Sequence, residues 1–191
     1  NEIQSLTVSA DGLWVAVSES GGELSIWDLV ARRETARLKS TPRARPAFSP
    51  AAPWLAFITA ETEGPAPGPP GRQQRVRVWN VAEGTTIVDL ALDAGCRGLA
   101  FSTNGTQLLT IGFDRQATTW SVPDGTRIRT QALPELPRFS SVVEISRDLS
   151  LAAFGAQGSN LCVVDLNTGA ERWSARAAEE TITALAFSPD T

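Results

Sequence analysis

The chain has 191 residues, of which 42% are hydrophobic and 20% are charged, and its formal net charge is -4. This mildly acidic balance gives no electrostatic basis for non-specific binding of nucleic acid or of anionic membranes. The chain contains no histidine, which excludes the Ser-His-Asp and Cys-His catalytic arrangements and imidazole metal ligands. No run of 18 apolar residues is present, so we expect no transmembrane helix.

The first forty residues predict four short strands separated by turn signals. We place these strands near residues 3–9, 14–19, 23–28 and 34–38. Asp11-Gly12 is a strong hairpin dipeptide, because both central positions of a type I′ turn need positive φ. The apolar run over 13–17 fits a strand that neighbouring sheets cover on both faces. Helical periodicity is weak throughout the chain, so the sequence predicts an all-β fold.

The pattern of this first segment returns along the chain. Each copy has a short apolar strand that ends in a serine before a turn, and these serines are Ser9, Ser49, Ser102, Ser146 and Ser188. A second landmark ends a later β-rich run in each complete copy, as Trp27-Asp28, Trp79-Asn80, Trp120-Ser121 and Val164-Asp165. The predicted units are therefore 3–40, 41–92, 93–134, 135–178 and the incomplete 179–191, with an insertion at 61–74 in the second unit.

Four-stranded units of this length with a Trp-Asp landmark resemble the WD-repeat β-propeller family. The resemblance implies a β-propeller of four-stranded antiparallel blades, with about four and a half blades present as part of a propeller of about seven. A β-sandwich is the alternative, but it gives no reason for serine and tryptophan to recur at fixed offsets. An open arc of blades would expose apolar sheet faces, which predicts packing against further blades or self-association.

The chain departs from the family pattern in its polar residues. The Gly-His dipeptide of the family is missing, and of the aspartates that precede the tryptophan by six positions only Asp114 remains. We therefore expect the hydrogen-bond network that stiffens many such blades to be absent. The residues expected to serve as structural repeat landmarks are Trp27, Asp28, Trp79, Trp120, Asp114 and Asp165. Trp173 is the tryptophan that we expect to be partly exposed, and Cys96 and Cys162 are expected to be reduced and buried.

Two features suggest partner binding. The proline-rich insertion contains Pro67, Pro70 and Arg72 in a PxxPxR pattern of the kind that SH3 domains bind, although such short patterns are common and a plain flexible insertion is the favoured interpretation. Arginines also recur just before the first strand of the units, as Arg43, Arg45, Arg97 and Arg138. By resemblance these connections share one face of the disc, where a basic rim could bind acidic or phosphorylated segments. Solvated loop charge is the alternative.

No catalytic residue, cofactor or metal is expected, because the aspartates fall at turn positions of the repeat. The resemblance implies a non-catalytic protein–protein interaction scaffold or sensor platform that binds partners through loops on one face. The alternatives are a propeller-type enzyme or substrate-binding domain with a site in the central channel, and a propeller whose main contact is another domain of its own chain. We expect a cytoplasmic location and protein partners, with neither nucleic acid nor membrane among them.

Overall fold

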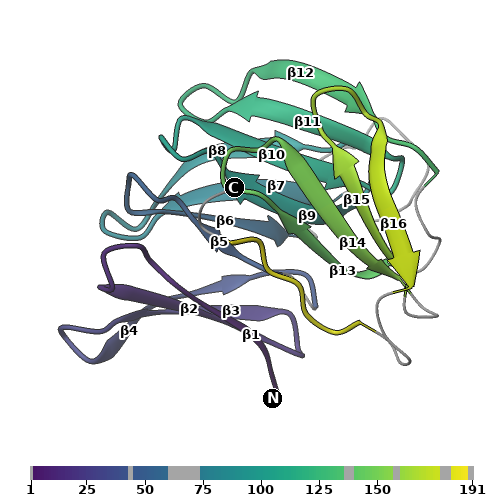
Figure 1. Ribbon diagram of the computed structural model, residues 1–191. Coiled ribbons are helices and arrows are strands. Elements are labelled where there is room, and N and C mark those ends of the chain that lie inside the picture. Colours follow the sequence, from purple (N-terminus) through teal and green to yellow (C-terminus); the bar gives the residue numbers. More distant parts are fainter. Residues whose placement is uncertain are drawn as a thin grey trace.

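The computed structural model describes residues 2–42, 45–59, 74–135, 140–156, 160–176 and 182–188. The described residues form strands, turns and extended segments and contain no helix (Figure 1). The strands build four antiparallel sheets, and within each sheet they lie side by side in chain order. We call these sheets blades one to four.

The strand bounds of the first blade agree closely with the sequence prediction. Blade one contains β1 (Ile3–Val8), β2 (Trp14–Glu19), β3 (Glu23–Asp28) and β4 (Arg33–Lys39). Blade two contains β5 (Ala47–Phe48), β6 (Trp54–Thr59), β7 (Arg75–Asn80) and β8 (Thr85–Ala91). Blade three contains β9 (Cys96–Phe101), β10 (Gln107–Gly112), β11 (Gln116–Ser121) and β12 (Arg127–Ala132). Blade four contains β13 (Ser140–Ile145), β14 (Leu151–Ala156), β15 (Asn160–Asp165) and β16 (Glu171–Arg176).

The first strands of successive blades lie next to one another, so β1 contacts β5, β5 contacts β9, and β9 contacts β13. The blades therefore follow each other in an arc around these inner strands (Figure 1). This arrangement is that of a β-propeller, as the sequence predicts. Strand β5 ends at the same repeat position as β9 and begins only after Pro46, since a proline has no amide hydrogen to donate to the ladder.

The repeated serine holds the hairpin between the first two strands of a blade. The Ser102 hydroxyl donates to Asn104 Oδ1 at 2.7 Å and accepts from the Gln107 amide at 3.0 Å. Ser146 makes the same pair of contacts with Asp148 and Leu151. A serine recurs at this position because its hydroxyl both donates and accepts.

The residue after the tryptophan landmark holds the next turn. Asp28 Oδ1 accepts hydrogen bonds of 2.8 Å from the amides of Val30 and Ala31. Asn80 and Asp165 accept from the corresponding amides of their own turns. The recurring Asp or Asn is therefore a turn acceptor in these blades.

Three apolar cores join the blades. Blades one and two pack Ala16, Leu24 and Ile26 against Leu55 and Phe57. Blades two and three share the core of Ile58, Val76, Val78, Leu90, Phe101 and Leu108, and blades three and four that of Leu109, Ile111, Ala152, Phe154 and Val164. Each core thus lies between two consecutive blades and holds their facing sheet surfaces together.

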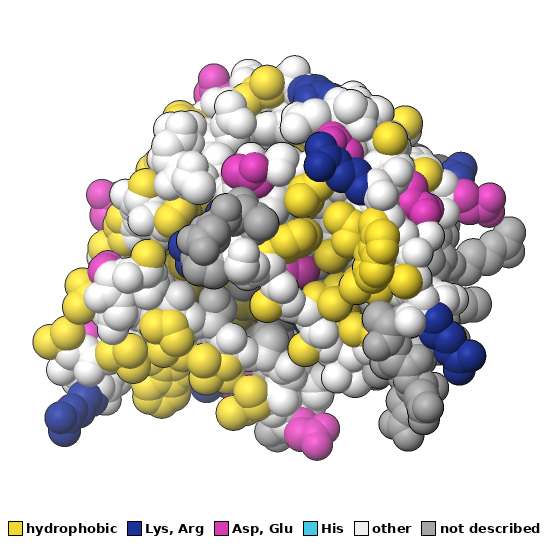
Figure 2. Space-filling view, in the orientation of Figure 1, with side chains coloured by type: hydrophobic (Ala, Val, Ile, Leu, Met, Phe, Trp, Pro, Cys, Tyr) yellow, Lys and Arg dark blue, Asp and Glu magenta, His cyan; other side chains and the backbone are white. Residues whose placement is uncertain are grey.

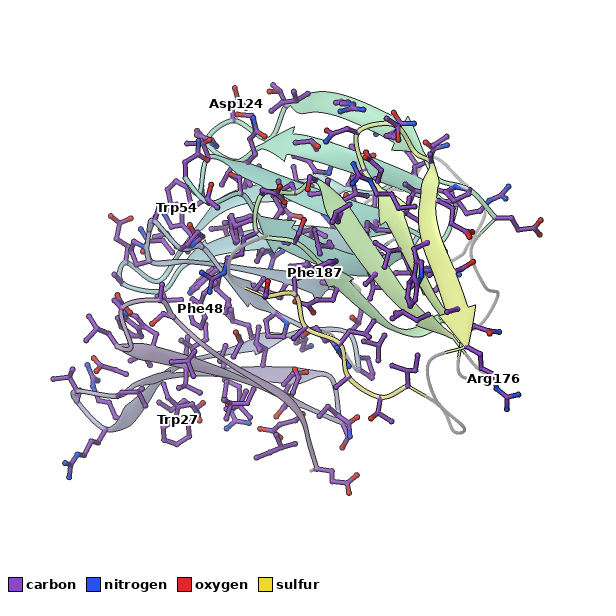
Figure 3. All side chains as sticks on the ribbon, viewed as in Figure 1. Trp27, Phe48, Trp54, Asp124, Arg176 and Phe187 are labelled. Atoms are coloured by element: carbon purple, nitrogen blue, oxygen red, sulfur yellow. The ribbon has the colours of Figure 1, made fainter. Side chains whose placement is uncertain are left out.

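The two faces at the ends of the arc are only partly covered by the described residues. The landmark residue Trp27 is 38% exposed and projects from blade one on the side away from blade two (Figure 3). At the other end Trp173 is 51% exposed, as the sequence predicts. Residues 182–188 form no strand; Ile182 lies against Gly155 of β14, and Phe187 lies near the centre of the arc (Figure 3). Hydrophobic side chains gather over both blade one and blade four (Figure 2).

Candidate functional site

Loops of several blades meet at one edge of the arc. The Thr41 amide, after β4, donates to the Ile58 carbonyl of β6 at 2.9 Å. The Phe113 amide, after β10, donates to the Gly95 carbonyl before β9 at 2.8 Å. The Cys96 amide donates to Gln74 Oε1, just before β7, also at 2.8 Å. These bonds place the connections into the inner strands beside the turns after the second strands, and we call this edge the loop face.

Two of the four predicted rim arginines lie in the described part of the chain. Arg45 is exposed, and its positive charge acts on Glu144 of β13. Burial raises the pKa of Glu144, and the charge of Arg45 opposes that shift. Arg45 therefore lies close enough to blade four for its charge to interact with Glu144, although it belongs to the connection into blade two. Arg43, Arg138, Pro67, Pro70 and Arg72 lie outside the described residues.

Arg97 is not a freely projecting rim charge. Its guanidinium carbon lies 4.7 Å from the centroid of the Phe113 ring, which is cation–π geometry. Partial burial lowers the pKa of Arg97. The side chain therefore lies against the loop face and supports an aromatic ring there.

Phe113 is the feature of the loop face that sequence reasoning missed. Its side chain is 58% exposed although it is large and apolar. A Cβ built on Gly95 would come within 2.9 Å of the Phe113 ring, so the missing side chain of Gly95 leaves room for the ring. Arg115, two residues after Phe113 in the same turn, has a positive φ of 66°. A phenylalanine inside a turn that otherwise favours Gly and Asp was the signal in the sequence.

Blade three retains one polar contact of the kind expected to be absent. Trp120 Nε1 donates a hydrogen bond of 2.9 Å to Thr110 Oγ1. Arg127 covers the Trp120 ring at 5.0 Å and pairs with Asp93 at 2.7 Å. The expectation of a missing network is therefore wrong for this pair. The expectation rested on the missing Gly-His dipeptide and the missing aspartates, whereas threonine accepts the indole hydrogen bond directly.

The described residues contain no group of three or more Cys, Asp or Glu side chains arranged to hold a metal ion. Cys96 and Cys162 are buried free thiols. Burial is the main cause that raises the pKa of Cys96 to about 12 and that of Cys162 to about 11. Both thiols are therefore protonated at neutral pH and poor nucleophiles. No helix able to cross a membrane occurs in this part of the chain.

No protein-family model matches the chain, and no curated protein matches it in sequence. The fold is similar to the crystal structure of the β-propeller domain of Cps50 (Swd1) from Myceliophteria thermophila, with a TM-score of 0.71 and 15% sequence identity. The match covers 100% of this chain and 60% of that chain. At this identity the similarity shows the β-propeller fold alone, and the chain spans about 60% of the structure that it matches.

Proposed function

We propose that this protein is a non-catalytic platform that binds a protein partner through its loop face. The observation that carries the proposal is the exposed Phe113 ring, held in place by Arg97 and Gly95. Exposed aromatic and arginine side chains on a rigid support are the residues that most often dominate binding energy at protein interfaces. A ring already fixed by its neighbours loses little conformational entropy when a partner covers it.

The chemistry around Phe113 indicates the partner. The ring offers apolar surface, while Arg45 and Arg115 are exposed arginines on loops of the same face. Arginine forks favour carboxylate and phosphate groups. We infer a partner segment with one apolar anchor residue flanked by acidic or phosphorylated residues.

Selection from a random peptide library displayed on phage tests this function. The wild-type chain should enrich peptides that combine an apolar anchor with acidic residues, and Phe113→Ala should weaken their binding at least tenfold. Ile128→Ala is the matched control, because Ile128 is 51% exposed but lies on the outer strand β12, away from the loop face and from both ends of the arc. Failure to enrich any peptide, or equal loss in both variants, would refute the proposal.

We also infer that the open faces of blades one and four favour self-association. Where blades three and four meet, Arg129 and Gln131 of β12 donate to oxygens of Asn167 and Thr168 in the β15–β16 turn. Polar residues of an outer strand thus meet a polar turn of the next blade.

The two open ends match in the same way, but with apolar residues. In β16, Trp173 and Ala175 occupy the positions that Arg129 and Gln131 occupy in β12. The turn after β3 of blade one exposes Leu29 (44%) and Val30 (75%). An outer strand that presents Trp173 and Ala175 and a turn that presents Leu29 and Val30 therefore stand open at opposite ends, which supports head-to-tail contact between copies of the chain.

A further inference from the structure

We propose that a pocket between blades two and three binds a small organic cation, with a primary ammonium group held by Asp114 and by the hydroxyl groups of β10 to β12. The pocket has a volume of about 270 Å³. Its lining includes Asp93, Thr110, Asp114, Thr118, Trp120 and Arg127. The pocket lies beside the Phe113 surface, since Gly112 and Asp114 flank Phe113, but the Phe113 side chain is not part of its lining. The inference does not depend on the proposed function.

The pocket exists because one position of the repeat changes from a large to a small residue. Thr110 occupies the same repeat position as Phe57 of blade two and Phe154 of blade four. Each of these residues pairs with the residue that lies two positions before the landmark of its blade. Phe57 and Phe154 are fully buried and fill the interface of their own blade with the preceding one. Threonine is much smaller, so this position in blade three leaves open the space that a phenylalanine fills in blades two and four.

The floor of the pocket is a row of hydroxyl groups. Thr110 and Thr118 are 4% and 8% exposed, and Thr110 Oγ1 donates to the Thr118 carbonyl at 3.4 Å. Thr118 Oγ1 and Thr130 Oγ1 are 3.3 Å apart. Trp120 fixes the row at one end through its bond to Thr110. A rigid, polar floor of this kind suits a ligand that offers several hydrogen-bond donors.

The charge of the lining favours a cation. Three lining residues are charged, namely Asp93, Asp114 and Arg127. Arg127 neutralises Asp93 in an ion pair of 2.7 Å, whereas Asp114 pairs with no cation among the residues that the structure describes. Asp114 Oδ1 accepts one hydrogen bond of 3.1 Å, from the Gln116 amide. The lining thus carries one uncompensated negative charge, which attracts an ammonium group and repels an anion.

Gly112 leaves room for the Asp114 carboxylate beside the pocket. A Cβ on Gly112 would collide with the Asp114 carboxylate, so glycine allows the side chain to fold back over the pocket. An ammonium group has three donors, which one carboxylate and the threonine hydroxyls can accept. The volume lies at the lower limit of small-molecule sites, which suits a short-chain amine and excludes a nucleotide or a peptide.

Titration with butylammonium, followed through the indole Nε1–H resonance of Trp120 by NMR, tests the proposal. A Trp120→Phe variant assigns that resonance among the six tryptophans. We expect a saturable shift with butylammonium, binding at least tenfold weaker with butanol, and no shift with butyrate. Asp114→Asn should weaken the butylammonium affinity at least tenfold. Asp124→Asn is the control, because Asp124 is an exposed turn aspartate away from the pocket and should leave the affinity unchanged.

Thr110→Phe provides a second test, because it places in blade three the residue that blades two and four carry at this position. We expect this variant to fold and to lose the butylammonium shift. The proposal is overturned if butanol binds as well as butylammonium, which would indicate an apolar void, or if no shift appears, which would indicate a water-filled pocket. A shift that persists in Thr110→Phe, or an unchanged butylammonium affinity in Asp114→Asn, would also overturn it, and Asp114→Asn decides if Thr110→Phe does not fold.

Discussion

Trp120 and Thr110 are joined across β10 and β11 by a hydrogen bond from the indole nitrogen to the threonine hydroxyl, 2.9 Å long and buried from solvent. Removal of the acceptor would leave the indole N–H buried without a partner. An unsatisfied buried donor costs about 1–3 kcal/mol. We therefore expect Thr110→Val to lower the free energy of unfolding in urea by that amount.

Thr130→Val is the control for this variant. The Thr130 hydroxyl contacts only Thr118 among the described side chains, at 3.3 Å, and the residue is exposed. Surface substitutions of this kind usually change stability by less than about 0.5 kcal/mol. If both valine variants unfold at the same urea concentration, the Trp120 bond contributes nothing measurable.

Alanine substitutions at Gly12 and Gly125 would measure the cost of backbone strain and the cost of a steric clash separately. Both have positive φ, 71° and 70°, in which an alanine costs about 1–2 kcal/mol. A Cβ at Gly12 has open space, whereas at Gly125 it would lie 2.5 Å from Val88 Cγ2 of blade two. We expect Gly12→Ala to show the strain cost alone, and Gly125→Ala to lose about 1–3 kcal/mol more through overpacking. If both variants lose the same free energy of unfolding in urea, the Val88 side chain of blade two must move aside to accommodate the new methyl group.

Asp165 makes the stability of blade four sensitive to acid. Hydrogen bonding to Arg172 is the main cause that lowers the pKa of Asp165 from 3.8 to about 2. A carboxylate with a lowered folded pKa stabilises the protein above pH 3.8, and this contribution disappears as the pH falls to about 2. Asp165→Asn should therefore be less stable than wild type at pH 7, and its stability should fall less between pH 4 and pH 2.

Arg172→Gln checks the cause of that pH dependence. It removes the partner of Asp165 Oδ2, whose two hydrogen bonds are 2.7 and 3.0 Å long, and keeps the turn bonds to Oδ1. Urea unfolding at pH 7, 4 and 2.5 should show a reduced acid dependence in this variant as well. Parallel curves for the wild type and both variants would assign the acid sensitivity to other carboxylates.

The sequence predicted the fold well because it repeats. The strand predicted at 14–19 is found as Trp14–Glu19, and the one at 23–28 as Glu23–Asp28. The recurring serines fix hairpins through local hydrogen bonds, so their effect can be inferred without tertiary structure. The expected type I′ turn at Asp11-Gly12 is wrong, because Gly12 has a positive φ of 71° and Asp11 does not. Periodic local signals of this kind leave few alternatives for the chain.

The candidate sites were harder to predict because they depend on neighbouring blades. Arg97 was expected to form part of a charged rim, yet its orientation is set by Phe113 in a different loop. The pocket depends on Thr110 replacing a phenylalanine that only the strand register identifies. Comparison of the units position by position would have shown that replacement, but not that space remains beside it.

The open faces at the two ends of the arc lead to a last prediction, about self-association. Trp173 is half exposed on β16, and Val30 is 75% exposed in the turn after β3. If these surfaces contact each other between copies, a charge on either should disrupt the contact, because a buried unpaired charge is costly. We expect light scattering after size exclusion to give a mass above 20.4 kDa for the wild type and a lower mass for Trp173→Asp and Val30→Asp. Ile128→Asp is the control, since Ile128 is 51% exposed on β12, away from both ends. A wild-type monomer at all concentrations would show that the exposed faces do not bind each other, and equal effects of all three variants would indicate non-specific aggregation.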